Sequence, residues 1–352
     1  MREKILSVLK EYDPDRIKVG TLGSHSALNI LKGAKDEGFE TVCICRSRER
    51  IIYESFNVAD CIIEVQDFKE LLTKNLQERL IEENVILIPH GSFNAYIGNL
   101  EKIIVPFFGN RELMIWETDR RKQREWLERA GLKMPRNLKP EEIGGIAIVK
   151  YHGAMGGKGY FLVANEDDFY KKFEELKKEG FVKSFEDVEI QEYIVGANVY
   201  FSFFYSPMNE RVELIAIDRR YEPVDGLGRI SADIQLKSNV KSTYTVIGNF
   251  PVVLRESLLV KALESARAVV DVSKEIAYPG IVGPFCLETV FDENAEMYVF
   301  EISARIVAGT NVGIPDSPYS YILWGENMYM GRRIAREIKI AIEKDALGEI
   351  VY

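Results

Sequence analysis

The spacing of apolar residues in the first 110 positions constrains the fold of this chain most. Short apolar strands are expected at residues 17–22, 39–45, 85–89 and 103–107, and a helix is expected at 26–37. Apolar strands that alternate with helices are typical of a parallel, doubly wound sheet. The sequence therefore predicts an α/β fold that begins with a parallel sheet.

The pattern changes after residue 110, where strands begin to follow one another directly. The expected elements are a helix at 111–130, strands at 146–150, 160–164 and 188–194, a helix at 166–179, hairpins at 198–218 and 283–305, and helices at 254–276 and 331–344. Hairpins join antiparallel strands. The second part is therefore predicted to be an α+β domain, with the domain boundary between residues 115 and 116.

Composition limits the classes of function. The chain has 352 residues, a net charge of −9 and 46% hydrophobic residues, values expected of a soluble globular protein. A general nucleic-acid binder would be basic, and no apolar run approaches the roughly 18 residues of a membrane helix. Four cysteines do not make a disulfide framework in a chain of this length, so we expect a reducing cytoplasm and no membrane partner.

The hairpin at 283–305 carries two glutamates that its register brings together. With a turn at residues 294 and 295, Glu293 faces Glu296 and Glu288 faces Glu301. Directly opposed Cβ atoms lie about 4.5–5.5 Å apart, where like charges repel. Ser303 and Arg305 are expected on the same face as the glutamates. The other face is predicted to be mostly core and carries Leu287, Thr289, Phe291, Phe300, Ile302 and Ala304.

Two carboxylates beside a hydroxyl and a guanidinium favour a magnesium site that binds phosphates. The polar, solvent-facing side of an ordinary hairpin would contain the same residues, and a bulge would break the register argument. The hairpin by itself leaves both interpretations open.

A glycine-rich loop at residues 153–159 follows the strand that ends in Lys150. It contains Gly156, Gly157 and Lys158, but no Ser or Thr follows the lysine and the next element is a strand, so it is not a Walker A motif. Its backbone amides can still contact phosphates, with Lys150 and Lys158 supplying charge. The alternative is a flexible hairpin tip.

Two polar loops follow predicted parallel strands. Residues 21–26 include Ser24 and His25 and open a helix, whose first amides suit an anion. Residues 89–92 include Ser92 and follow another strand at its carboxyl end, where open α/β sheets bind ligands. The first loop lacks the G-x-G-x-x-G spacing of a dinucleotide site. Each histidine taken singly is more often a hydrogen-bonded loop residue than a catalyst.

Further polar groups end strands of the second part. Residues 218–222 include Arg220 and Glu222, and an arginine there can bind a substrate phosphate. Asn249 ends the segment 245–249. Residues 192–196 can offer backbone groups to an adenine edge. Each of these segments can also be a plain strand end with solvated polar groups.

In this order the motifs resemble the ATP-grasp superfamily. The matching features are the helix ending Gly-x-x-x-Pro at 131–135, Lys150 with its glycine loop, the strand end at 192–194 and the paired Glu288 and Glu301. That superfamily often has Asn two residues after the second acid, where this chain has Ser303. The resemblance implies a Rossmann-like N-terminal domain (1–115) and an ATP-grasp domain (116–352), with a small subdomain at about 140–197 and a larger one at about 198–352.

Within that superfamily the chain is similar to the archaeal, formate-dependent synthetases of 5-formaminoimidazole-4-carboxamide ribotide (FAICAR), the PurP type. The similarity spans nearly the whole chain. The strings that carry it are Thr-Leu-Gly-Ser-His (21–25), Ile-Leu-Lys-Gly-Ala-Lys (30–35), Pro-His-Gly-Ser-Phe (89–93), Gly-Asn-Arg (109–111), Asp-Arg-Arg-Tyr-Glu (218–222), Gly-Pro-Phe-Cys-Leu (283–287) and Arg-Ile-Ala-Arg-Glu-Ile (333–338).

The resemblance implies a ligase of purine (IMP) biosynthesis with ATP and Mg²⁺ or Mn²⁺ as cofactors. Formate would attack the γ-phosphate of ATP, and the amine of 5-aminoimidazole-4-carboxamide ribotide (AICAR) would displace phosphate from the resulting formyl phosphate. The family also implies a homo-oligomer, a trimer or hexamer. The implied site residues are Glu288 and Glu301 for the metal; Lys150, Gly156, Gly157, Lys158, Glu192, Tyr193, Ile194, Asn198 and Glu222 for ATP; and Ser24, His25, Ser92, Arg220 and Asn249 for the ribotide. On its position beside the glutamates, Arg305 is our candidate for the transferring phosphoryl group, together with Lys158.

Three alternatives remain at this point. A PurP-like paralogue, or another ATP-dependent carboxylate–amine ligase, would act on a different small substrate. A nucleotide-sensing protein would keep the fold without turnover, but the retained Glu288, Glu301, Lys150 and Arg305 argue against it, because sensing ATP does not need two metal carboxylates.

Overall fold

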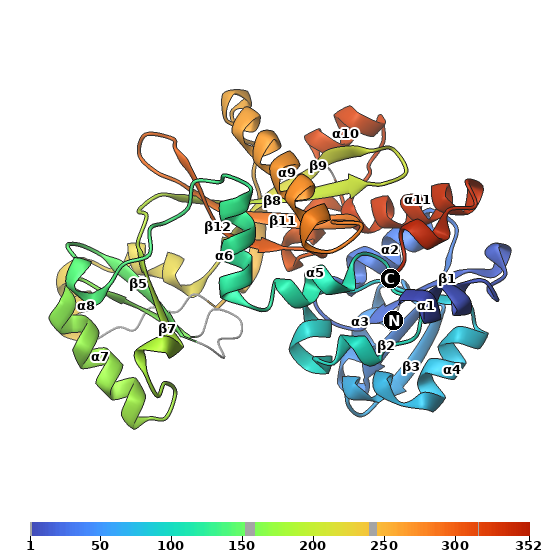
Figure 1. Cartoon of the computed structure of the whole chain (residues 1–352), viewed down its shortest axis with the longest axis horizontal. Coiled ribbons are helices and arrows are strands. Elements are labelled where there is room, and N and C mark those ends of the chain that lie inside the picture. Colours follow the sequence, from blue (N-terminus) through green and yellow to red (C-terminus); the bar gives the residue numbers. More distant parts are fainter. Residues whose placement is uncertain (1, 152–158, 239–244, 316) are drawn as a thin grey trace.

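The structure is a computed structural model that describes residues 2–151, 159–238, 245–315 and 317–352. Within these residues the strands form a four-stranded, a three-stranded and a five-stranded sheet. In Figure 1 the four-stranded sheet lies at the right, the three-stranded sheet at the left, and the five-stranded sheet between them. No helix in the described segments is long and apolar enough to cross a membrane.

The four-stranded sheet is parallel and has the order β3-β2-β1-β4, which confirms the prediction for the N-terminal part. Its strands are β1 (Lys18–Leu22), β2 (Glu40–Arg46), β3 (Cys61–Val65) and β4 (Val85–Leu87). The helices of this part are α1 (Arg2–Leu9), α2 (Ala27–Asp36), α3 (Ser47–Ser55), α4 (Lys74–Glu82) and α5 (Arg111–Trp116).

Two predicted elements of this region are wrong. Residues 103–107 form no strand and contribute a single bridge between Phe107 and Leu87. Pro106 has no N–H to donate to a ladder, although its carbonyl accepts from Leu87 N. The helix expected at 111–130 is broken into α5 and α6 (Arg120–Arg129), because Asp119 caps the backbone N–H groups of residues 121 and 122 and starts a new helix.

The three-stranded sheet is antiparallel, with the order β6-β5-β7. Its strands are β5 (Ala147–Tyr151), β6 (Tyr160–Val163) and β7 (Val188–Glu192), and α7 (Glu166–Lys178) packs on it through Phe169 and Phe173. These elements were predicted correctly. They form a core of their own, separate from the other apolar clusters.

The five-stranded sheet has the order β10-β9-β8-β11-β12 and is antiparallel throughout. Its strands are β8 (Ala197–Ser206), β9 (Arg211–Tyr221), β10 (Gly248–Pro251), β11 (Gly283–Phe291) and β12 (Met297–Ser303). Helix α9 (Glu256–Ile276) and α6 pack on its apolar face with Phe201, Leu287 and Ile302. The opposite face is therefore free to carry polar residues.

The C-terminal part of the chain packs back onto the N-terminal sheet. The remaining helices are α8 (Ala232–Ser238), α10 (Pro318–Trp324) and α11 (Met330–Glu343). Helix α11 packs against α2, where a Cβ on Gly33 would lie only 2.1 Å from the backbone N of Arg332, so only glycine fits. His90 and Ile306 also form a parallel bridge. These contacts fix the N-terminal strand ends against the end of β12, while the domain boundary at 115 and 116 stays a prediction.

The hairpin of β11 and β12 pairs Glu288 with Glu301, as predicted, although its turn and the register next to the turn differ from the prediction. The expected facing of Glu293 and Glu296 is wrong, because Asp292 N donates to Glu296 O and shifts the turn by one residue. A bulge on β12, opposite the step from Glu288 to Thr289 on β11, shifts the register back. The Asp292 carboxylate, which accepts from the backbone N of residues 294 and 296, stabilises the longer turn.

Phe300 is the extra residue of this bulge, and its predicted place on the core face is wrong. It packs with Tyr200 and Cys286 on the face that carries Glu288. Ordinary period-two alternation fails at a bulge, so a residue that simple counting puts on one face is turned to the other.

Candidate active site

The polar face of the five-stranded sheet carries a row of functional groups across neighbouring strands. Register aligns Glu301, Glu288, Tyr200 and Asp218 on strands β12, β11, β8 and β9. Directly opposed residues share one face of an antiparallel sheet. The period of two then adds Arg220 on β9, so three carboxylates and one guanidinium meet on a single surface.

Glu288 is the most constrained acid of the row. It is buried, and its Oε1 accepts a 2.7 Å hydrogen bond from the Arg220 guanidinium. Its Oε2 is buried with no hydrogen-bond partner in the described part of the chain. Burial raises the pKa of Glu288 to about 7; Arg220 opposes this shift and the charge of Glu301 adds to it. An unpaired buried carboxylate oxygen beside a second carboxylate is the donor set that a hard divalent cation takes.

Arg220 also contacts an aromatic ring on this face. Its guanidinium lies 4.2 Å from the centre of the Tyr200 ring. Its pKa is raised despite burial, because Glu288 faces it. Arg220 also pairs in register with Asn249, whose side chain donates to Asp218 at 2.7 Å. Burial raises the pKa of Asp218 to about 6, with Asn249 and Arg220 opposing the shift.

Arg305 follows β12 and is oriented by Glu117, which sequence reasoning missed. Arg305 Nε donates to Glu117 Oε1 at 2.9 Å, and Glu117 Oε2 accepts from Ala304 N at 2.6 Å. Asn94 donates to the same carboxylate at 3.2 Å. Glu117 is buried between α5 and α6, and 188 positions separate it from Arg305, so no local motif could reveal the pair.

The two polar loops predicted at strand ends meet at the carboxyl edge of β1 and β4. Ser24 Oγ and Ser92 Oγ are 2.9 Å apart. The rings of His25 and His90 stack with 5.2 Å between their centroids. His90 is buried and neutral: its Nε2 contacts Leu22 O, its Nδ1 accepts from Ser92 N, and burial lowers its pKa to about 4.

This loop cluster lies beside the sheet site. A Cβ on Gly91 would stand 2.9 Å from His25 Nε2 and 3.5 Å from Arg305 Cζ, so these two side chains border one small space. The structure thus brings together the predicted residues Ser24, His25, Ser92 and Arg305.

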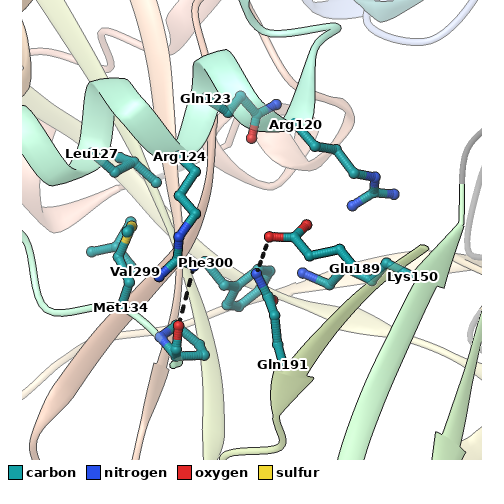
Figure 2. Close-up of a pocket in the computed structure, with 11 residues that line it drawn as sticks. Arg120, Gln123, Arg124, Leu127, Met134, Lys150, Glu189, Gln191, Val299 and Phe300 are labelled. Atoms are coloured by element: carbon teal, nitrogen blue, oxygen red, sulfur yellow. Dashed lines mark hydrogen bonds between the residues drawn. The ribbon is translucent and has the colours of Figure 1, made fainter. Parts of the chain in front are cut away.

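Lys150 lies in a hollow lined mainly by residues of α6, β5, β7 and β12 (Figure 2). Figure 2 shows Arg120 and Lys150 pointing toward this space from α6 and β5, with Glu189 between them. Lys150 Nζ lies 5.9 Å from the centre of the Phe300 ring. Burial lowers the pKa of Lys150; Glu301 opposes the shift and Arg120 adds to it. Sequence reasoning missed Arg120 and Glu189, since neither belongs to the motifs it considered.

The other described residues predicted to bind ATP are not among those that line this hollow. Glu192 ends β7, and its carboxylate accepts from Arg136 Nε at 2.9 Å. Tyr193 and Ile194 follow it, and Asn198 lies exposed on β8. Glu222 ends the β9 segment half-buried, and burial raises its pKa. Gly156, Gly157 and Lys158 lie outside the described residues.

Comparison with known proteins shows which sequence families this chain resembles. Residues 19–138 match a family described as a protein of unknown function (DUF1246), and residues 168–352 match a domain of unknown function (DUF1297). A protein from Archaeoglobus fulgidus is 67% identical over 356 residues, which cover 100% of this chain and 99% of that protein. One from Methanocaldococcus jannaschii is 46% identical and covers 99% of each chain. Both are named 5-formaminoimidazole-4-carboxamide-1-(beta)-D-ribofuranosyl 5′-monophosphate synthetase.

Solved structures agree with the fold. The IMP biosynthesis protein PurP from Thermococcus kodakaraensis has a TM-score of 0.77 and 33% identity, covering 95% of this chain and 100% of that one. An N5-carboxyaminoimidazole synthetase from Staphylococcus aureus, solved with ADP, has a TM-score of 0.57 at 17% identity, covering 84% of this chain and 71% of that one. The second likeness concerns the fold alone.

Proposed function

We propose the function of this chain from one premise: it belongs to the family of 5-formaminoimidazole-4-carboxamide ribotide synthetases. The predicted family and the ATP-grasp fold are thereby confirmed. The chain is an ATP-dependent ligase of purine biosynthesis that joins formate to the 5-amino group of AICAR and releases ADP and phosphate. The observation that carries this proposal is the close approach of the strand-end loops to the two-glutamate face, which places a ribotide site beside a phosphoryl site.

The reaction is proposed to run in two steps. A formate oxygen attacks the γ-phosphorus of ATP, the bond to ADP breaks, and formyl phosphate forms. The 5-amino nitrogen of the ribotide then attacks the formyl carbon and phosphate leaves. Both steps spread negative charge over phosphoryl oxygens, so most of the catalysis is positioning and electrostatic stabilisation.

Glu288 and Glu301 fit a divalent cation, because one buried carboxylate oxygen has no other partner in the described structure. They would hold Mg²⁺ or Mn²⁺, which neutralises phosphoryl charge when bound. Arg305, fixed by Glu117, would bind the transferring phosphoryl group together with Lys158. Glu288 is buried, so charges close to it interact more strongly than they would in bulk solvent.

The other predicted residues divide between the two large substrates. We assign ATP to Lys150, Gly156, Gly157, Lys158, Glu192, Tyr193, Ile194, Asn198 and Glu222; of these, Lys150 lines the hollow in Figure 2. We assign the ribotide to Ser24, His25, Ser92, Asn249 and Arg220; among them, Ser24 contacts Ser92, and Asn249 contacts Asp218. We also propose a cytoplasmic homo-oligomer, a trimer or hexamer, which light scattering on a sizing column tests directly.

The test is phosphate release from ATP with Mg²⁺, formate and AICAR, each omitted in turn. We expect release to require all three small molecules, and a product heavier than AICAR by one formyl group. Release without formate, or a ribotide left unchanged, would contradict the proposal. In that case the ligase acts on a different small substrate.

A further inference from the structure

The hydrogen bonds around His25 determine which ring nitrogen carries its proton. Ser26 Oγ lies 2.6 Å from His25 Nδ1 and 2.9 Å from the carbonyl oxygen of Val307. A carbonyl oxygen only accepts, so the single hydroxyl hydrogen of Ser26 goes to Val307. The Ser26 oxygen must then accept from Nδ1–H of His25. In the neutral ring this leaves a lone pair on Nε2.

That lone pair lies next to the groups of the proposed site. A Cβ on Gly91 would stand 2.9 Å from Nε2 and 3.5 Å from Arg305 Cζ, so Nε2 lies close to Gly91 and near the guanidinium, although the residue as a whole is exposed. Within the described segments no protein group donates a hydrogen bond to Nε2. The Arg305 side chain, which would orient the phosphoryl group, therefore lies near a ring nitrogen that has no hydrogen-bond donor in the described segments.

The surroundings keep this ring neutral. The charged and titratable groups that face it are His90, Arg305 and Arg220. Crowding by protein atoms, His90 and the two arginines all hold the pKa of His25 well below its ordinary value. The backbone is held as well, since His25 has φ of +54°, a left-handed conformation that costs energy in most residues and recurs at functional sites.

We propose that His25 Nε2 is the base that accepts the proton of the ribotide 5-amino group during formyl transfer. As the nitrogen bonds to the formyl carbon it gains positive charge and its proton becomes acidic. Nε2 takes that proton, the C–O bond to phosphate breaks, and phosphate leaves with the bonding electrons. The proton stays on the imidazolium until solvent removes it. This inference rests on the proposed function and gives His25 a chemical role in place of a binding contact.

The test separates the two half-reactions by supplying synthetic formyl phosphate and AICAR without ATP. Two variants, His25→Asn and His25→Gln, remove the base but retain a polar side chain, and asparagine tolerates the left-handed backbone. We expect single-turnover formyl transfer to fall by about 10²–10⁴-fold, the usual contribution of a general base. The first half-reaction, followed as formate-dependent isotope exchange within ATP, should change by less than about threefold, because it requires no base. In the native protein, the transfer rate should not fall as the pH is lowered to about 6.5, because the pKa of His25 is held below this ordinary histidine value.

Each outcome has one meaning. Variants that transfer the formyl group at nearly the native rate would overturn the role of His25 while leaving the synthetase intact. Equal loss of both half-reactions would also overturn it, because His25 would then act in binding or folding. A native protein that completes the ATP step but formylates no AICAR would instead contradict the proposed function. Ser47→Ala, which removes an exposed hydroxyl bonded to Glu64, is the matched control and should leave both rates unchanged.

Discussion

The strand-end loops and the polar face of the five-stranded sheet differ in whether their polar groups have hydrogen-bond partners. In the loops, Ser24 bonds Ser92, and both ring nitrogens of His90 have partners. On the sheet, Glu288 faces Glu301 and keeps one buried oxygen without a partner in the described structure. A satisfied network is rigid before any ligand binds, whereas an unsatisfied carboxylate pair is stabilised only by what it binds. The loops are therefore suited to binding the neutral ring of a substrate. The sheet is suited to binding charged ligands.

The largest effect is expected where the unsatisfied pair is broken. Glu301→Gln should reduce turnover by about 10³-fold, because charge that stabilises phosphoryl oxygens is lost. Without metal the variant should be more stable by about 0.5–1 kcal/mol, since two opposed like charges become one. Steady-state kinetics and urea unfolding measure the two effects. Glu293→Gln, at an exposed turn position, is the control; full activity of Glu301→Gln would remove the metal assignment.

A smaller loss is expected from the contact that joins the two regions. Glu117→Gln leaves Arg305 Nε or Ala304 N without a carboxylate acceptor, so kcat should fall by about 10–100-fold and stability by about 2–3 kcal/mol. Glu275→Gln removes the exposed partner of Arg129 and should cost at most about 1 kcal/mol with native kcat. If the two variants behaved alike, Glu117 would have no special role in orienting Arg305.

The two regions should also respond to pH with opposite signs. Between about pH 4 and 6.5 His90 stays neutral in the folded state but is protonated when unfolded, so its contribution to stability is lost as pH falls. Between pH 3.8 and about 6 Asp218 stays protonated when folded but ionises when unfolded, so its contribution is lost as pH rises. Each of these two pKa shifts corresponds to a change of about 3 kcal/mol in the free energy of unfolding.

Urea unfolding from pH 4 to 7.5 would separate these contributions. Relative to the native protein, Asp218→Asn should gain stability toward pH 7 and His90→Gln should gain it toward pH 4. Differences of the same sign in both variants would show that the contrast between the loops and the sheet is wrong.

The smallest effect should come from the hydroxyl pair in the loops. Ser92→Ala removes one hydrogen bond of about 1 kcal/mol, so the KM for AICAR should rise about five- to tenfold while kcat stays within about twofold. An equal rise in the KM for ATP would contradict the division of the site between two substrates. Initial rates measured with AICAR and ATP varied in turn give the two KM values that test this division.

The sequence predicted the sheets well because their signals are local. The pattern of apolar residues gave β1, β2 and β4 of the parallel N-terminal sheet, but not β3, and both hairpins of the five-stranded sheet. Outside the bulge, each side chain's face follows from the period of two. The facing of Glu288 and Glu301 was right although the turn was wrong, because the longer turn and the bulge shift the register in opposite directions. Phe300 shows the limit of counting, since the bulge moved it to the site face.

The sequence by itself determined the fold class, most of the strands, the paired glutamates, the polar loops after two strands and the family resemblance, since each depends on residues close together in the chain. Only the tertiary structure decided what these groups meet. It placed Glu117 on Arg305 and Ser26 between His25 and Val307, across 188 and 281 positions. Such contacts arise when helix α11 and the end of β12 pack onto the N-terminal sheet, and the periodicity of a sequence carries no record of which distant backbone will supply an acceptor.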